Sequence, residues 1–357
     1  MSFSIRIAVP LALLAASVPT HAIAGSILSE LPNSSERIVS TVPANGDVNP
    51  YGIAFVPPGF PAGGLLEPGD ILVSNFNNSQ NLQGTGTTIV KITPGGSVSV
   101  FFRGEMGLGL TTALGVLQGG FVLVGNVPTT DGTSATVQQG SLLIIDRFGH
   151  LFGTLANASL LDGPWDLTIN DMGIFAQVFV SNVLSGTVTR LDVSVERNEF
   201  KTIGVTQIAH GYLHRTDPAA LVVGPTGLAF DPLSGVLYVA STGDNEIFAV
   251  PFAGQIQHDA GMGKLVYKDP VHLHGPLGLA LAPDGNLITA NGDAVNPGGT
   301  QNALVEFTPG GKFVSQFQVD SGAPGGAFDV AISTIGGQLR LAAVDDVQNT
   351  LDIWNVR

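Results

Sequence analysis

The sequence contains no cysteine and few positively charged residues. Without cysteine, disulfide bonds and thiol chemistry are excluded. Fourteen lysines and arginines stand against 28 aspartates and glutamates, which gives a formal net charge of −14. An acidic chain is a poor match for nucleic acids and for anionic membrane surfaces. We therefore expect no nucleic-acid partner.

Several catalytic motifs are also missing. The sequence has no Gly-x-Ser-x-Gly elbow, no phosphate-binding loop, no His-Glu-x-x-His pair and no EF-hand loop. It therefore carries no motif for a serine nucleophile, for nucleotide binding or for a zinc protease. Whether the protein has any catalytic activity is left open by the sequence.

The first 24 residues have the composition of a secretory signal peptide. One cation, Arg6, precedes an apolar segment over residues 7–18, and Ala22 and Ala24 supply a small-residue cleavage pattern before Gly25. A membrane anchor is the alternative, but the apolar segment is shorter than the ~20 residues that a spanning helix needs. We therefore expect cleavage of residues 1–24, a secreted or periplasmic location and no membrane span.

Residues 224–250 define a repeating unit. Residues 228–230 form a short apolar strand that ends in the turn-forming segment 231–235. Residues 236–240 are β-branched and aromatic, as in a strand covered on both faces, and residues 246–250 form a more peripheral third strand. Such a unit cannot bury its own faces, so it must stack on copies of itself.

The unit occurs six times, and its inner strands begin at intervals of 61, 53, 61, 51 and 51 residues. The expected inner strands are residues 50–55, 111–116, 164–169, 225–230, 276–281 and 327–332. The expected second strands are residues 71–75, 122–126, 178–182, 237–241, 287–291 and 339–343. Units of this number and length predict an all-β, six-bladed β-propeller.

The two ends of the repeat region predict how the ring closes. The sixth unit stops after its third strand, residues 351–356, and therefore lacks an outer strand. Residues 36–42 form an unassigned strand before the first unit, and pairing the two would remove an exposed edge. We therefore expect one propeller domain over residues 36–357, preceded by a lead-in over residues 25–35.

The repeated pattern, Pro-x-Gly followed by apolar residue, Ala and apolar residue, resembles the NHL-repeat and SMP-30/gluconolactonase-like six-bladed propellers over residues 36–357. The resemblance implies a fold that lactonases, lyases and non-enzymatic binding modules share. It also implies that several metal ligands of the lactonases, and histidines of the NHL-type amidating lyases, occupy the x position. The equivalent residues here are Tyr51, Thr112, Trp165, Thr226, Leu277 and Phe328, none of which is a good ligand for a divalent metal.

Two aspartates take the place of the glycine in this pattern. Asp166 and Asp329 lie in units three and six, which are opposite each other in a ring of six. Across a narrow channel, the two carboxylates could share a divalent cation such as calcium or shift each other's pKa. The structural alternative is that each carboxylate only accepts hydrogen bonds from nearby backbone.

A second candidate site is a ring of amides at the ends of second strands. Such a ring could bind a sugar or coordinate a hard cation weakly. The alternative is structural, because asparagine tolerates the left-handed conformation of a strand-ending turn. The predicted ligand-binding set comprises Asn75, Asn126, Asn182 and Asn291, together with Tyr51 and Trp165.

Histidines supply the third candidate. His272 and His274 directly precede the fifth inner strand, and His210 and His214 lie in the connection before the fourth. Imidazoles gathered there could hold a transition metal or act as acid and base. The alternative is that they are solvated loop residues.

Propeller geometry places the loops after the second strands on the same face as the loops that lead into the inner strands, and we name this the top face. Three of its loops are long and polar, residues 75–87, 127–139 and 292–302. Long loops on a rigid scaffold are frequent binding sites. We expect a monomeric scaffold that binds a small molecule, a glycan or an envelope protein through its top face and central channel. The alternative is a metal-dependent hydrolase or lactonase that uses the aspartates, the asparagines or the histidines.

Overall fold

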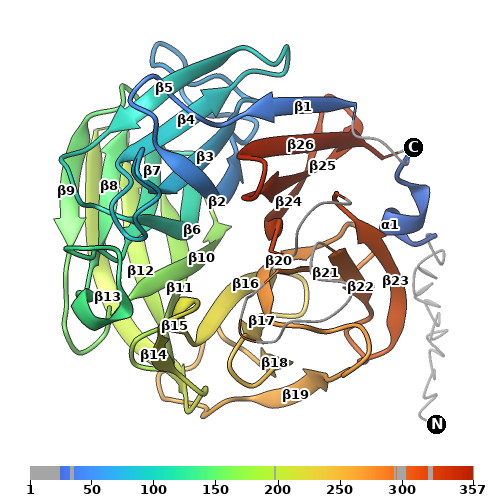
Figure 1. Ribbon diagram of the computed structural model, residues 1–357. Helices are drawn as coiled ribbons and strands as arrows, with labels where there is room; N and C mark the ends of the chain where they lie inside the picture. The colour runs from blue at the N-terminus through green and yellow to red at the C-terminus, as the bar shows by residue number, and fades with distance from the viewer. Residues whose placement is uncertain are drawn as a thin grey trace, which may run out of the picture.

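The structure is a computed structural model that describes residues 25–32, 36–196, 198–292, 295, 303–320 and 325–356. These residues form six four-stranded antiparallel sheets arranged as blades around a central axis (Figure 1). The all-β, six-bladed propeller expected from the sequence is confirmed. The expected signal peptide, residues 1–24, and the lead-in residues 33–35 lie outside the described residues.

Each blade runs from an inner strand at the axis to an outer strand at the rim. Blade 1 contains β2 (Val48–Phe55), β3 (Ile71–Asn77), β4 (Thr88–Ile92) and β5 (Val98–Arg103); blade 2 contains β6 (Leu110–Leu117), β7 (Phe121–Asn126), β8 (Ser141–Asp146) and β9 (Leu151–Leu155). Blade 3 contains β10 (Pro164–Asp171), β11 (Phe175–Asn182), β12 (Thr187–Glu196) and β13 (Glu199–His210); blade 4 contains β16 (Pro225–Asp231), β17 (Val236–Ser241), β18 (Glu246–Val250) and β19 (Lys264–Tyr267). Blade 5 contains β20 (Pro276–Leu281), β21 (Leu287–Asn291), β22 (Ala303–Phe307) and β23 (Phe313–Gln318); blade 6 contains β24 (Ala327–Ile335), β25 (Gln338–Asp345), β26 (Thr350–Asn355) and β1 (Arg37–Ser40).

Blade 6 is built from both ends of the propeller sequence. The N-terminal strand β1 pairs with β26 in antiparallel register, from Arg37 opposite Ile353 to Ser40 opposite Thr350. In Figure 1 the blue strand lies beside the red ones at the rim. The predicted closure is confirmed, and it leaves β26 with partners on both sides.

Every inner strand has a register irregularity near its start. In five of the six blades the shift falls at the Pro-x-Gly position or its equivalent, for example between Pro50 and Ile53 and between Pro225 and Leu228. Blade 2 has the longest shift, between Leu110 and Leu114. A bulge frees backbone groups from the ladder, so donors at these positions are available to neighbouring blades.

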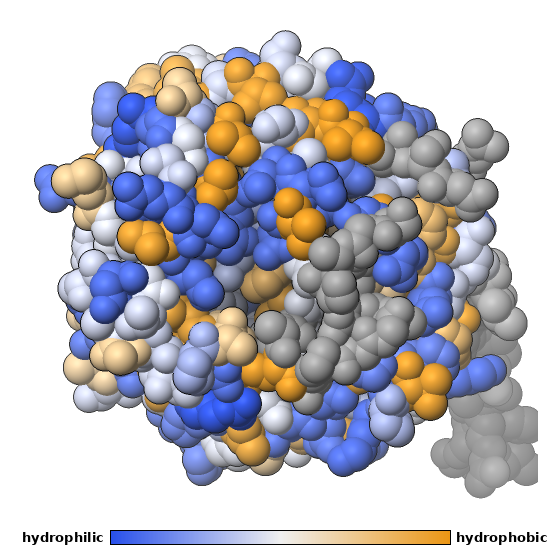
Figure 2. Space-filling view, viewed as in Figure 1, coloured by the Kyte–Doolittle hydropathy of each residue, from blue (hydrophilic) through white to orange (hydrophobic). Residues whose placement is uncertain are grey.

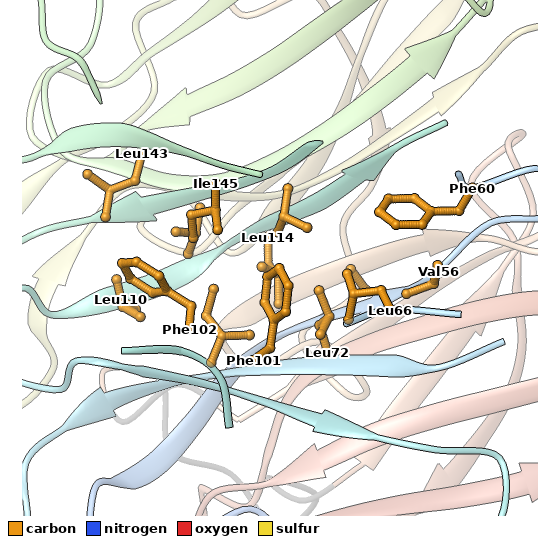
Figure 3. Close-up of a cluster of buried hydrophobic side chains, with 14 residues drawn as sticks. Val56, Phe60, Leu66, Leu72, Phe101, Phe102, Leu110, Leu114, Leu143 and Ile145 are labelled. Carbon is orange, nitrogen blue, oxygen red and sulfur yellow. The ribbon is translucent and has the colours of Figure 1, made fainter. Parts of the chain in front are cut away.

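Apolar side chains fill the spaces between neighbouring sheets. Between blades 1 and 2, Leu72 of β3, Phe101 of β5 and Ile145 of β8 belong to one buried cluster (Figure 3). Burying each side chain of this size contributes about 1.5–3 kcal/mol. These packed seams hold the inner strands in fixed positions around the axis.

Two features were not expected from the sequence. A short helix, α1 (Ile27–Glu30), packs its apolar side against the core between blades 5 and 6. The buried carboxylate of Glu306 holds it by accepting hydrogen bonds from Ser26 Oγ at 2.6 Å and Leu28 N at 3.0 Å. A hairpin of β14 (Arg215–Asp217) and β15 (Leu221–Val223) precedes blade 4.

No helix in the described residues is long and apolar enough to cross a membrane.

Candidate binding channel on the propeller axis

A cavity of about 310 Å³ lies on the axis, bounded by the inner strands. At the level just below the Pro-x-Gly position, each of the six blades contributes one apolar side chain to its wall. These six residues are Ile53, Leu114, Leu167, Leu228, Leu279 and Val330. The ring is narrow and apolar because the pattern places the same kind of residue at the same height in every blade.

The cavity leads toward the bottom face, which is opposite the top face. Its lower wall includes Phe230, Leu281 and Ile332. Leu281 and Ile332 also line a cavity of about 370 Å³ among the bottom turns, where Asp231 and Gly285 lie. Apolar side chains thus predominate from the leucine level to the bottom turns, with Thr168, Asp231 and Thr334 as polar side chains among them.

Asp166 and Asp329 lie at the upper end of this cavity, and each is 6% exposed. The Oδ2 atom of Asp166 accepts a hydrogen bond from Leu228 N in blade 4 at 3.1 Å, and the Oδ2 atom of Asp329 accepts one from Ile53 N in blade 1 at 2.8 Å. The bulges free these backbone donors. Each aspartate therefore connects its blade to the next one in the ring.

Burial gives both carboxyl groups a pKa above the ordinary value. Burial raises the pKa of Asp329 to about 7. The pKa of Asp166 is raised well above its ordinary range, first by burial and then by the negative charge of Asp329. Hydrogen bonds to Leu167 N and Leu228 N act in the opposite direction on Asp166. Two carboxyl groups in one apolar cavity therefore disfavour the doubly charged state near neutral pH.

Both aspartates therefore accept hydrogen bonds from nearby backbone, which is the structural alternative considered for them. The two carboxyl groups also interact electrostatically. It brings both side chains to one cavity, as the sequence predicted. A cation shared by them stays a prediction.

Aromatic rings close the channel above the aspartates. Tyr51 stacks on Phe328 with ring centroids 4.1 Å apart and on Phe76 at 4.5 Å, and Phe76 meets Trp165 edge-on at 5.4 Å. Tyr51 is 4% exposed and Trp165 is 3% exposed. We name these four residues the aromatic plug.

The plug separates the channel from a smaller cavity of about 220 Å³ at the top face, which Tyr51 and Phe328 also line. Asn49, Gln83 and Asp346 contribute polar groups to this upper cavity. Viewed along the axis, the surface is hollowed near its centre, and both hydrophilic and hydrophobic residues lie beside the hollow (Figure 2). Tyr51 thus reaches a cavity, whereas Trp165 packs within the plug.

The plug occupies positions that supply metal ligands in the propellers named by the sequence resemblance. Three of the six x positions, Tyr51, Trp165 and Phe328, are aromatic and packed against one another. At another x position, Thr226 Oγ1 donates to Pro276 O of the next blade at 3.0 Å. These side chains fill and tie the top of the axis, so the described x positions offer no set of metal-binding groups.

The four asparagines predicted at strand ends make one repeated contact, although β3 continues past Asn75 to Asn77. In each case the side-chain Nδ2 donates to a backbone carbonyl in the segment that leads into the inner strand of the same blade. The pairs are Asn75 with Thr41 O at 3.1 Å, Asn126 with Leu108 O at 3.1 Å, Asn182 with Leu160 O at 3.3 Å and Asn291 with His272 O at 2.7 Å. All four are buried, and none lines the axial channel. Sugar or cation binding by them stays a prediction.

The two histidines before blade 5 are engaged in their own turn. His272 Nδ1 lies 2.7 Å from Asp269 Oδ2, and its ring stacks on Phe313 at 3.9 Å. His274 Nε2 lies 3.2 Å from Val271 O. In the described part of the chain, no three His, Asp or Glu side chains are grouped so that they could hold a metal ion. Metal binding by these histidines stays a prediction.

The sequence reasoning missed the plug. Phe76 follows Asn75 within β3, and Leu221 and Val222 of the β15 strand pack into the same cluster. The aromatic residues at three x positions were the available signal, since x positions of neighbouring and opposite blades converge on the axis. Their mutual packing was not foreseen, and ligand contact by Tyr51 and Trp165 stays a prediction.

No protein-family model matches the sequence, and a search of curated proteins finds no relative. The structure resembles a gluconolactonase from Xanthomonas campestris with a TM-score of 0.58 and 15% identity, over 94% of this chain and 93% of that one. It also resembles a putative gluconolactonase (TM-score 0.55, 14% identity, 93% and 96% covered) and the calcium-binding protein regucalcin from Agrobacterium tumefaciens (TM-score 0.52, 14% identity, 89% and 94% covered). At these identities the likeness shows the six-bladed fold, in agreement with the resemblance seen in the sequence.

Proposed function

We propose that this protein is a binding propeller that takes a small ligand into its axial channel. The observation that supports this is a cavity ringed by one apolar side chain from each blade, whose upper end carries two buried carboxyl groups. Its volume of about 310 Å³ is at the small end of the range for small-molecule pockets, about 300–1,000 Å³. Ligand binding of this kind requires no catalytic residues, because the rigid ring of blades holds the site in a fixed shape.

The channel wall defines the kind of ligand that fits. The apolar side chains from all six blades favour a ligand with an apolar body. Asp166 and Asp329 favour a hydrogen-bond donor or a positive charge on the part of the ligand that reaches the upper end of the cavity. Burial disfavours the ionised form of these carboxyl groups. A cationic head group on the ligand would offset this desolvation cost. We therefore propose a small amphiphile with a protonated amine.

A metal-dependent hydrolase is the second candidate. The opposed aspartates and the likeness to gluconolactonases of known structure support it. The packed aromatic plug counts against it, because it fills the x positions at the top of the axis. Elemental analysis of protein purified without chelator, with the melting temperature before and after EDTA, separates the candidates. A stoichiometric metal whose removal lowers the melting temperature would favour the hydrolase.

We also propose that the protein is secreted or periplasmic. The support is the composition of residues 1–24, with an apolar segment followed by Ala22 and Ala24. Mass spectrometry of the intact mature protein tests this proposal. A mature chain that begins at Gly25 supports export, and retention of residues 1–24 on a folded cytoplasmic protein contradicts it.

The channel proposal is tested with n-hexylammonium as the probe. The sequence has two tryptophans, so Trp354→Phe leaves Trp165, directly before Asp166, as the only indole reporter. We expect n-hexylammonium to change the fluorescence of Trp165 in a saturable manner, and n-hexanoate of the same length to have no effect.

The variants for this test separate site binding from overall charge. Asp166→Asn and Asp329→Asn should each weaken n-hexylammonium binding by about tenfold or more, in line with the loss of one charged contact. Asp131→Asn removes the same charge from an exposed top loop and should bind like the parent. Equal binding by all variants, or equal responses to the amine and the carboxylate, would refute the channel site.

A further inference from the structure

A groove of about 640 Å³ lies off the axis on the top face, between blades 1 and 2. Its walls come from four connecting segments. Asn45 and Asp47 precede β2, residues 78–87 follow β3, residues 103–107 lead toward β6, and Thr129 and Thr130 follow β7. Two of the long polar loops noted in the sequence therefore meet here, at a site separate from the axial channel.

Most residues of the lining carry an amide or a hydroxyl group, and few of them are charged. Each of these groups can both donate and accept hydrogen bonds. The amide and hydroxyl residues of the groove are Asn45, Asn78, Ser79, Gln80, Thr85, Thr87, Thr129 and Thr130. Asp47 and Arg103 are its ionisable residues. This composition matches a ligand rich in hydroxyl groups better than it matches an ion.

Hydrogen bonds hold the loops of the groove in place. Asn78 Oδ1 accepts from Gln80 N at 2.9 Å, and Thr129 Oγ1 donates to Gln83 O at 2.6 Å, which joins the loops of the two blades. Asp47 Oδ2 accepts from Thr87 N at 2.8 Å. A site whose loops are already fixed loses little conformational entropy when a ligand binds.

One groove residue has an unused hydrogen-bonding atom. Asn45 Oδ1 is buried, and in the described part of the chain it has no hydrogen-bond partner. Its Nδ2 atom makes only a long contact of 3.5 Å with Thr87 Oγ1. A buried acceptor without a partner is unfavourable. Because Oδ1 has almost no exposed surface, the Asn45 side chain must turn toward the groove for a ligand hydroxyl to satisfy it.

The groove also has an apolar contact surface. Met106 is 97% exposed, and its side chain lines the groove together with the partly buried Leu82. A thioether is flexible and polarizable, so it adapts to an irregular apolar surface. The C–H face of a pyranose ring is such a surface, and its hydroxyl edge would meet the amides opposite.

We propose that this groove binds a short oligosaccharide. The hydroxyl-rich ligand uses the amide and hydroxyl groups, Asn45 Oδ1 accepts from one sugar hydroxyl, and Met106 contacts a ring face. This proposal goes beyond ligand binding in the channel, and it adds a second site made of different residues. Failure of one site therefore leaves the other testable, since Asp166→Asn should not change saccharide binding.

Methyl NMR of carbon-13-labelled methionine tests the proposal. Met106 lies in the groove, whereas Met172, which is 56% exposed, lies in the turn between β10 and β11 on the bottom face. The probes are cellobiose, maltotriose, chitobiose and trigalacturonate, titrated separately. We expect at least one of them to move the Met106 signal in a saturable manner while the Met172 signal stays fixed. No saturable change with any probe, or equal movement of both signals, overturns the proposal.

Two variants then assign the binding to groove groups. Asn45→Ala removes the unused acceptor and should weaken binding by about tenfold, the effect of one ligand hydrogen bond. Thr130→Ala changes an exposed side chain, so it should leave stability unchanged and weaken binding severalfold. Ser134→Ala lies on the same loop outside the groove and should bind like the parent. Unchanged affinity in both groove variants would contradict the proposed site.

Discussion

Replacing Asp329 by asparagine should flatten the dependence of stability on pH. Burial raises the pKa of this carboxyl from 3.8 to about 7 in the folded protein. The folded state therefore binds the proton more tightly than the unfolded chain does. The resulting stabilisation is fully present below about pH 4 and is lost as the pH rises through about 7.

The size of the effect follows from the same values. One unit of pKa corresponds to about 1.36 kcal/mol, so raising the pKa of Asp329 from 3.8 to about 7 corresponds to a loss of about 4 kcal/mol across this pH range. Asparagine resembles the protonated carboxyl in shape and can still accept one hydrogen bond, from Ile53 N or Val330 N. The variant should therefore be close to the parent at about pH 4 and increasingly more stable than the parent as the pH rises to about 8.

Chemical denaturation at several pH values measures the difference. Asp345 and Asp352 also have raised pKa values, about 7 and about 6, so the parent should lose stability with rising pH for more than one reason. Only the difference in unfolding free energy between the parent and Asp329→Asn isolates the contribution of the channel carboxyl group. Asp131→Asn is the control, because hydrogen bonds lower the pKa of that exposed carboxyl and leave it ionised throughout this range. Parallel stability curves for the parent and Asp329→Asn would refute the assigned electrostatics.

Three further substitutions test the plug, the asparagines and the spacing of the inner strands. Trp165→Ala should cost about 3–5 kcal/mol of unfolding free energy, measured by urea denaturation, because it empties the packed plug. Asn182→Ala should cost about 1–3 kcal/mol without changing n-hexylammonium affinity; a selective loss of ligand binding at unchanged stability would instead support a ligand contact. Gly278→Ala should lower the melting temperature, since a Cβ there would lie 2.1 Å from Asp329 Oδ1, whereas Gly153→Ala, with no atom nearer than 3.8 Å, should not.

The fold could be predicted because its signals are local and repeated. The second strand of blade 4 and its third strand, Glu246–Val250, were visible as a β-branched run and a turn-bounded strand. The closing strand β1 was predicted because one unit lacked a partner at its edge. By contrast, α1 is only four residues long, and it depends on the buried Glu306 for its position. No local pattern encodes a contact between residues this far apart in the sequence.

The site was predictable only in part, for a physical reason. The position of Asp166 and Asp329 followed from the repeat, because equivalent residues in opposite units must face one axis. Whether an equivalent residue points into the cavity or into a neighbouring blade depends on side-chain packing. Asn126, Asn182 and Asn291 end their strands as expected, whereas β3 continues past Asn75 to Asn77. The contacts of the asparagines with the segments leading into the inner strands could not be read from the sequence.

The geometry of the ring limits where acidic residues can occur on the axis. Gly278 in blade 5 lies so close to Asp329 in blade 6 that even a methyl group at position 278 would meet the carboxylate. The acid of blade 6 thus requires glycine at position 278 of blade 5, whereas Ala113 stands at the equivalent position of blade 2, before Asp166. Asp166 and Asp329 stand three blades apart, above a ring of apolar side chains. Two acids over such a ring suit a ligand with a single cationic end better than a bare ion that needs many oxygen ligands.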